Sequence, residues 1–197
     1  MYKYKLTNQA MKTHNDFQWT LGKTETISTE GGELCSESFF HAYHDPLLAV
    51  FLNPIHADID NPKLFKVLVD GEYKDDNGLK CGYKSMTLVE EMELPEVTLN
   101  QRVAFGILCA LEVYKNKKYV TWAKNWLNGA DRSSDAARAA YAAHAAHAAY
   151  AAHAAYAAYD AAHAAAHATA YAAAYATRAA NNNIDLITIA KKAMAYN

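Results

Sequence analysis

Arginine, tyrosine and histidine supply the side chains that could do chemistry in a stretch otherwise made almost entirely of alanine, residues 136–180. Tyrosine rings can stack on nucleobases, and arginine can both stack on rings and pair with phosphate oxygens through charge-assisted hydrogen bonds. This combination indicates a nucleotide-type ligand. The candidate ligand-binding residues in the C-terminal half are Arg102, Arg138, Tyr141, Tyr175 and Arg178.

The histidines of the same stretch do not predict a metal site. His144 with His147, and His163 with His167, have spacings that can place two imidazoles on one ion. However, the stretch has no cysteine, few carboxylates and no His-Glu-x-x-His motif. We therefore expect these histidines to pack with their polar tips exposed, and we expect neither a metal ion nor a cofactor.

A second group of candidates lies in "FFHAYHDP", residues 39–46. His41 and His44 are three residues apart, so on a strand their side chains point to opposite faces. A structural role is the first interpretation for each, with ligand binding by His41 as the alternative. Pairing of His44 with Asp45 is not expected, because adjacent side chains seldom meet.

No pattern in the sequence is typical of an active site. The phosphate-binding loops P-loop and G-x-G-x-x-G are missing, and no nucleophilic triad is recognisable. Cys35 lies between Glu33 and Glu37, whose charges disfavour a reactive thiolate. We therefore predict no catalytic residue and favour a protein that is not an enzyme.

The elements that must position these residues follow two different patterns, which divide the chain near residue 95. All the prolines lie at or before Pro95, and short apolar runs between turn signals predict strands over 16–22, 23–29, 37–43 and 83–94. A further strand over 63–73 is expected to meet a turn at Asp70-Gly71, and a brief helix is expected between Pro46 and Pro54. Residues 1–95 are thus predicted to form a small, mainly β module.

Residues 96–197 are predicted to be helical throughout. Thr98 and Gln101 form a capping box at the start of the first helix, and further helices are expected over 119–127, from Ser133 or Ser134 to 180, and over 184–197. Between Arg138 and Tyr159 a large side chain recurs every three residues, which winds these side chains around the helix. The helix either folds back near Tyr159-Asp160 or stays long and packs against other chains. The predicted class is α+β, with an alanine-rich helical bundle that forms homo-oligomers.

Charge and cysteine content exclude several classes of protein. The formal net charge is −2, and neither half has the basic excess that grips a phosphate backbone, so nucleic acid is an unlikely partner. Three scattered cysteines indicate neither a disulfide framework nor a zinc site, which favours a reducing cytoplasmic setting. The first residues lack the apolar region of a secretory signal, and no apolar run is long enough to span a membrane.

Several motifs resemble an uncharacterised module of bacteriophage proteins: Phe17-Gln18-Trp19 with Gly22-Lys23, then Ser38-Phe39-Phe40-His41-Ala42 and Pro46-Leu47. The module's usual pattern contains Gly-Phe-His-Ala-Cys, so this chain departs from it at Phe39 and Tyr43. The alanine-rich region and the segment "IDLITIAKKAM" are similar to the tails of phage hypothetical proteins and of putative immunity proteins. The order of elements over 38–71 is also similar to that around the serine motif of ADP-ribosyltransferase-like domains, although the Ser-Thr-Ser triplet is missing.

The resemblance to phage proteins implies a phage accessory protein that acts by binding in the cytoplasm of the infected host. The form we expect is an inhibitor of a bacterial defence system, which captures a host defence protein or a small nucleotide signal. One alternative is an active or degenerate ADP-ribosyltransferase-like enzyme. The other is a structural or assembly protein that oligomerises through the alanine-rich helix.

Overall fold

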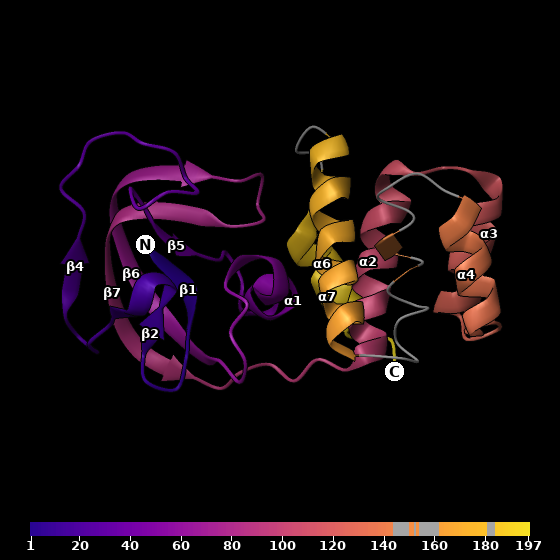
Figure 1. Ribbon diagram of the computed structural model, residues 1–197, viewed down its shortest axis with the longest axis horizontal. Helices are drawn as coiled ribbons and strands as arrows, with labels where there is room; N and C mark the ends of the chain where they lie inside the picture. Colours follow the sequence, from indigo (N-terminus) through magenta and orange to yellow (C-terminus); the bar gives the residue numbers. More distant parts are fainter. Residues whose placement is uncertain (144–149, 152, 154–161, 181–183) are drawn as a thin grey trace. The chain divides into compact units, whose positions relative to one another are not determined.

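The computed structural model describes residues 1–143, 150, 151, 153, 162–180 and 184–197 (Figure 1). Two predictions concern residues that lie mostly outside this set: the winding of large side chains between Arg138 and Tyr159, and the choice between a fold-back near Tyr159-Asp160 and one long helix. The chain divides into two compact units, Met1–Pro95 and Glu96–Asn197. Each unit is described by itself below.

The N-terminal unit is built on a five-stranded antiparallel sheet. Its central pair is β6 (Lys63–Asp75) and β7 (Cys81–Met92), with β1 (Tyr2–Thr7) beside β6, and with β4 (Thr24–Thr26) and β5 (Phe40–Ala42) both beside β7. A separate two-stranded ribbon pairs β2 (Lys12–Thr13) with β3 (Phe17–Gln18) around the short 3-10 helix η1 (His14–Asp16). The five strands predicted from the sequence lie near β3, β4, β5, β6 and β7, whereas β1 and β2 were not predicted.

The long hairpin of β6 and β7 corrects one sequence prediction. Asp70-Gly71 does not end the strand: Gly71 adopts a φ of 85°, the pairing slips between Asp70 and Tyr73, and β6 then continues to Asp75. The chain reverses instead near Asn77 and Gly78, whose φ angles of 56° and 80° are those that Asn-Gly turns favour. The irregularity at Gly71 is a β-bulge, which adds twist without ending the ladder. As a result, Tyr73 and Asp75 belong to the sheet.

Helix α1 (Pro46–His56) follows β5 through an N-cap. The Asp45 carboxylate accepts a hydrogen bond from the backbone N–H of Leu47, and Pro46 occupies the first turn, where its missing N–H costs nothing. The prediction that Pro54 bounds the helix was wrong, because the helix continues for one further half-turn to His56. The Asp45 carboxylate therefore caps the helix, and His44 contacts a different carboxylate, that of Asp75.

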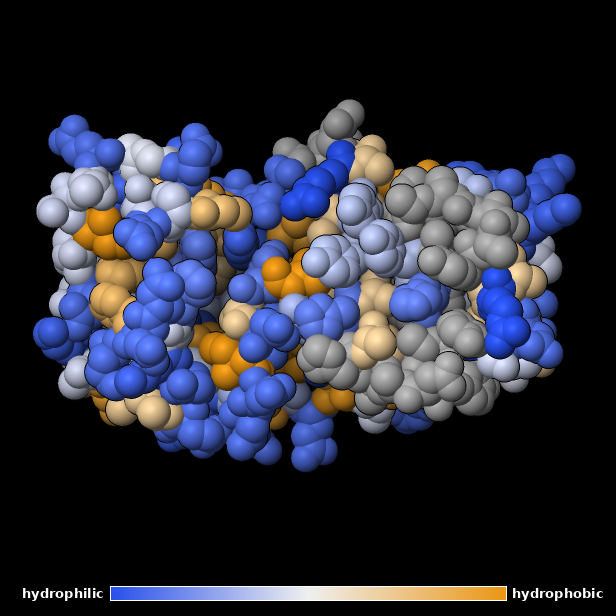
Figure 2. All heavy atoms as spheres, in the orientation of Figure 1, coloured by the Kyte–Doolittle hydropathy of each residue, from blue (hydrophilic) through white to orange (hydrophobic). Residues whose placement is uncertain are grey.

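Hydrophilic side chains cover most of the described surface on the face shown in Figure 2. In Figure 2, apolar side chains form small groups between hydrophilic ones. The large apolar side chains that remain at least a third exposed are Met1, Tyr2, Phe17, Leu21, Leu68, Tyr73, Val89, Tyr171 and Tyr175. Tyr171 and Tyr175 lie four residues apart on one helix, a spacing that puts both on the same face.

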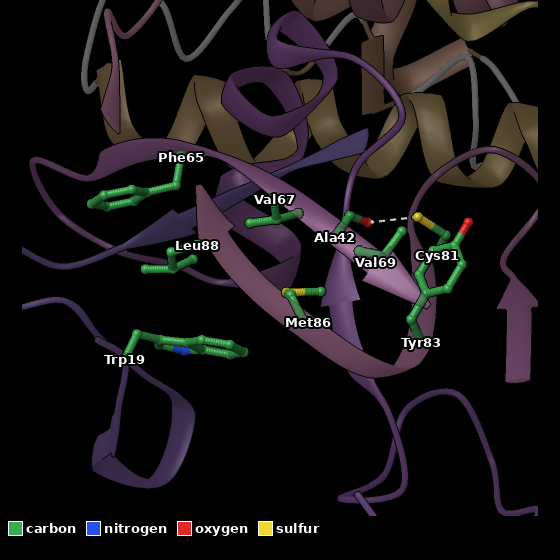
Figure 3. Packing of buried hydrophobic residues seen from close by; sticks show 9 residues of the cluster. All are labelled: Trp19, Ala42, Phe65, Val67, Val69, Cys81, Tyr83, Met86 and Leu88. Carbon is green, nitrogen blue, oxygen red and sulfur yellow. Dashed lines mark hydrogen bonds between the residues drawn. The ribbon is translucent and has the colours of Figure 1, made fainter. Parts of the chain in front are cut away.

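The core of the N-terminal unit gathers around Trp19. Its indole lies beneath β7 and faces Met86 and Leu88 (Figure 3), and it is 1% exposed. The indole N–H donates to the Thr13 hydroxyl at 3.0 Å, so the buried polar atom is satisfied. The other buried members of the cluster are Ala42, Phe65, Val67, Val69, Cys81 and Tyr83.

The C-terminal unit is helical in its described residues. It contains α2 (Leu99–Val113), α3 (Lys117–Leu127), α4 (Ser134–Ala143), α6 (Ala162–Ala179) and α7 (Leu186–Ala193). The predicted capping box is confirmed, since Thr98 and Gln101 exchange side-chain and backbone hydrogen bonds at the start of α2. Helix α2 packs against α3, α6 and α7, and α3 packs against α4. Together with the sheet, these helices make the chain α+β, as the sequence predicts.

Small side chains, and not tyrosines, fill the buried positions of α6, which packs against α2. Ala165, Ala172, Ala173 and Ala176 on α6 are fully buried, whereas its tyrosines are exposed. At the crossing, Gly106 of α2 lies so near Thr169 that an added Cβ would meet the Thr169 Cα at 3.3 Å. Small side chains on both helices therefore set the distance between them.

We expect Gly106→Leu to destabilise the C-terminal unit by about 1–3 kcal/mol, because the larger side chain must force α2 away from α6. Urea unfolding followed by circular dichroism at 222 nm measures the effect. Glu112→Leu, which places the same side chain on an exposed position of α2, is the matched control. Equal unfolding midpoints for the two variants would show that the helices do not depend on this contact.

Candidate functional site

Four polar side chains from three parts of the N-terminal unit meet in one chain of hydrogen bonds. Lys3 comes from β1, His44 from the segment between β5 and α1, and Tyr73 and Asp75 from the end of β6. Lys3 Nζ lies 2.7 Å from His44 Nδ1, and His44 Nε2 lies 2.6 Å from Asp75 Oδ2. The Tyr73 hydroxyl donates to the same Asp75 oxygen at 2.9 Å. We call this group the Lys3–His44–Asp75 relay.

The direction of each hydrogen bond in the relay follows from which side-chain atoms can donate a proton and which can only accept one. A lysine ammonium can only donate, so Nδ1 of His44 accepts and the ring proton is on Nε2. That proton is donated to Asp75, whose second oxygen accepts from the Gly78 backbone N–H at 2.6 Å. The relay thus holds one cation and one anion on either side of a neutral imidazole.

Asp75 is the electrostatic centre of the relay. Partial burial works to raise the pKa of its carboxyl, but hydrogen bonds from His44, Gly78 and Tyr73 outweigh burial and lower the pKa below its usual value. The pKa of Tyr73 is raised by burial, by its hydrogen bond to Asp75 and by the Asp75 charge. Asp75 is therefore ionised and Tyr73 is protonated at neutral pH.

The relay stays within reach of solvent. The side chains of His44 and Asp75 are 19% and 27% exposed, and Lys3 is half-buried. Beside the relay, the Tyr83 ring packs against Tyr73 at a centroid distance of 5.0 Å. Solvent therefore reaches the group from outside, beside the half-exposed Tyr73 ring.

Cys81 lies opposite Asp75 in the ladder but is not a nucleophile. Burial and the Asp75 charge raise the pKa of its thiol to about 12, against the opposing effect of Lys3 and Lys5. The thiol donates to the Ala42 carbonyl at 3.3 Å, the contact drawn in Figure 3. Cys81 is a packing residue with a satisfied S–H group.

The predicted candidate His41 is engaged in the structure of the loop that precedes it. Its Nε2 contacts the Leu34 carbonyl, and burial lowers the pKa of the ring to about 4, so the imidazole is neutral. The backbone carbonyl of His41 accepts a hydrogen bond from buried Lys5 at 2.8 Å. These contacts favour the structural interpretation of His41.

The other predicted candidates are distributed over three helices of the C-terminal unit. Arg102 is half-buried in the first turn of α2, where burial lowers the pKa of its guanidinium. Arg138 is exposed on α4, and the side chain of Tyr141 on the same helix lies outside the part of the chain that is described. Tyr175 and Arg178 lie on α6, three residues apart and both exposed.

Three tyrosine rings meet at the surface of α6, and we call them the tyrosine face: Tyr150, Tyr171 and Tyr175. The rings of Tyr150 and Tyr175 are stacked, with centroids 5.3 Å apart and planes at 6°. Tyr171 lies 5.6 Å from Tyr150 and 6.4 Å from Tyr175. Tyr171 and Tyr175 are 43% and 38% exposed, and Arg178 follows within one turn.

Sequence reasoning missed Lys3, Tyr73 and Asp75. Two signals pointed to them: "YKYKLT" alternates as a strand does, and Asn77-Gly78 is a stronger turn signal than Asp70-Gly71. Reading the hairpin from Asn77-Gly78 places Asp75 at the strand end. Its pairing with His44, 31 residues away, has no signature in the sequence.

The described residues contain neither a cluster of metal ligands nor a helix suited to a membrane. In the described residues, no three His, Cys, Asp or Glu side chains gather as they would around a metal ion. Among the described helices, none has both the length and the apolar character needed to cross a bilayer.

Comparisons with known proteins give one match. The model of a family described as "Domain of unknown function (DUF7666)" matches residues 1–100, which include the whole relay but none of the tyrosine face. No curated protein and no solved structure matches significantly.

Proposed function

The chain belongs to the DUF7666 family of unknown function, and we propose that it acts by binding a partner rather than by turning over a substrate. The partner we propose is a small nucleotide signal, held at the tyrosine face. In the setting that the sequence suggests, the protein is a phage accessory protein that removes such a signal, or a defence protein, from the cytoplasm of an infected host.

The observation that carries this proposal is the exposure of Tyr171 and Tyr175 on one face of α6, with Arg178 one turn beyond Tyr175. The buried side chains of the described part of α6 are alanine and threonine, whereas the Tyr171 and Tyr175 rings stay more than a third exposed. A base stacked on an aromatic side chain gains about 1–3 kcal/mol, and a guanidinium can pair with a phosphate in a bidentate manner. The face thus offers both contacts that a nucleotide requires.

Two alternative functions involve different parts of the chain. An assembly role would use the tyrosine face as a contact between copies of the chain in an alanine-rich helical bundle. An ADP-ribosyltransferase-like role finds less support: β5 and β6, the strands on which the likeness in element order rests, each pair with β7 and not with each other in the described sheet.

Isothermal titration with a cyclic dinucleotide, ADP-ribose and the corresponding nucleoside tests the proposal. We expect the two phosphate-containing ligands to bind, and Tyr175→Ala to weaken their binding by about tenfold or more because a stacking surface is lost. Arg178→Gln is expected to weaken the phosphate-containing ligands and to leave binding of the nucleoside unchanged. Because Arg178 also offsets the negative end of the α6 dipole, circular dichroism must show that the variant keeps its helix content.

Tyr2→Ala removes an exposed tyrosine from β1 and is the matched control. If the wild-type chain binds none of the ligands, the nucleotide proposal fails. If Tyr175→Ala instead converts an oligomer to a monomer in analytical ultracentrifugation, the assembly role replaces it.

A further inference from the structure

We propose that Lys3 is a carbonyl-reactive amine, which forms an imine with a small neutral aldehyde and uses His44 as the proton acceptor. This inference is independent of the function proposed for the tyrosine face. It concerns the unit that the family model matches, and it rests on the geometry of the Lys3–His44–Asp75 relay.

The partner of Lys3 sets it apart from the other lysines. An amine attacks a carbonyl only after it loses its proton, so a nearby proton acceptor that is not itself an anion favours attack. Nδ1 of His44, at 2.7 Å from Lys3 Nζ, is such an acceptor. In the described residues, the other lysines with an assigned hydrogen-bond partner contact carboxylates or backbone carbonyls, as Lys66 contacts Glu90 and Lys5 contacts the His41 carbonyl.

The third member of the relay prepares His44 to accept a proton. Asp75 holds the ring by accepting from Nε2 at 2.6 Å, and its negative charge stabilises the imidazolium that forms. Tyr73 and the Gly78 backbone N–H fix the carboxylate in turn, at 2.9 and 2.6 Å. This is the arrangement of nucleophile, base and orienting acid that activated nucleophiles share.

The proton and electron balance of the step closes within the relay and the ligand. Lys3 gives one proton to His44 Nδ1, and its nitrogen lone pair forms a bond to the aldehyde carbon. The carbonyl π electrons move to the oxygen, which takes a second proton from the same nitrogen and becomes a hydroxyl. The resulting carbinolamine loses that hydroxyl as water, which takes up the proton that His44 holds. The products are a protonated imine and water, His44 is neutral again, and no oxidation state changes.

The charges of the site select the class of ligand. Lys3 and Asp75 already balance each other, and proton transfer to His44 keeps a cation beside the anion. No unpaired cation remains among these residues to attract a carboxylate, so the site favours a neutral aldehyde over an oxo acid. The Tyr73 ring is 48% exposed and is held from behind by the buried Tyr83 ring at a centroid distance of 5.0 Å, so Tyr73 offers apolar surface to the body of such a molecule.

Reductive trapping measures the reactivity of each lysine in the same molecule. The full-length protein is incubated at neutral pH with propionaldehyde and cyanoborohydride, and peptide mass spectrometry gives the initial rate of alkylation at each site. We expect Lys3 to react about tenfold or more faster than Lys66, which is on the neighbouring strand and serves as the internal control. A Lys3 rate equal to or below that of Lys66 would overturn the proposal.

Two variants test the roles of the other residues. His44→Gln is expected to bring the Lys3 rate down to that of Lys66. Asp75→Asn is expected to slow Lys3 while leaving Lys66 unchanged, as a positioning residue should. Circular dichroism shows whether each variant folds. If one does not, the ratio of the Lys3 rate to the Lys66 rate in the wild-type protein still decides the question. If both variants fold and the Lys3 rate is unchanged, the relay does not activate Lys3.

Discussion

Trp19→Ala is expected to destabilise the N-terminal unit by about 3–5 kcal/mol, the range found when a buried tryptophan is truncated. Trp19 is 1% exposed and packs against Phe40 and Phe17 at centroid distances of 5.0 and 4.9 Å. It also lies 4.8 Å from the buried Lys5 ammonium, which would face the resulting cavity. A loss of this size is a large part of the stability of an ordinary small domain.

Hydrogen exchange read by mass spectrometry separates this effect from the C-terminal unit, because peptides from β6 and β7 report on the sheet alone. We expect those peptides to lose most of their protection in Trp19→Ala while peptides from α2 and α6 keep theirs. Phe17→Ala is the matched control: it belongs to the same ring cluster but is 36% exposed, so its truncation should cost much less. Equal protection in the two variants would contradict the central place given to Trp19.

Lys5 gives the second large effect, which depends on pH. Burial lowers the pKa of its ammonium from 10.5 to about 8, although Cys81 opposes this. Below pH 8 the folded and unfolded forms are both protonated, and the folded form bears the full cost of a buried charge. Between pH 8 and 10.5 the folded form is neutral while the unfolded form still binds a proton, so stability rises with pH in this window.

Comparison with Lys5→Met isolates this contribution, because the other titrating groups are common to both proteins. We expect the free energy of unfolding of the wild type, minus that of Lys5→Met, to increase by about 3 kcal/mol between pH 7 and 10.5. Urea unfolding at a series of pH values measures it. Lys66→Met, at a side chain that solvent reaches and that pairs with Glu90, should show only a small trend. A constant difference for Lys5→Met would mean that Lys5 keeps its proton throughout.

The local elements were predicted well where a few neighbouring residues decide the structure. The capping box of Thr98 and Gln101 and the start of α1 at Asp45-Pro46 both depend on contacts within four residues. Gly71 shows where such reasoning fails. A glycine after aspartate favours a turn, but pairing of β6 with β7 on both sides of Gly71 outweighs that preference and makes it a bulge.

The relay likewise could not be predicted from local sequence patterns. His44 was recognised as a titratable residue, and its neighbour Asp45 was correctly set aside as a partner. The residues that it does contact, Lys3 and Asp75, are 41 and 31 positions away, and the register of two strand pairs brings them together. One bulge fewer in β6 would point Asp75 to the opposite face of the sheet, because side chains alternate along a strand.

The amino-acid sequence by itself determined the α+β class, the change from turn-rich to helix-forming residues near Pro95, and the caps that begin α1 and α2, since these depend on composition and on contacts between near neighbours. Only the tertiary structure decided that alanine and threonine take the buried positions of α6 while Tyr171 and Tyr175 stay partly exposed, and that His44 joins Lys3 to Asp75. Both outcomes depend on which surfaces meet across distant parts of the chain. That choice is made by the packing of whole elements, and no short pattern of residues records it.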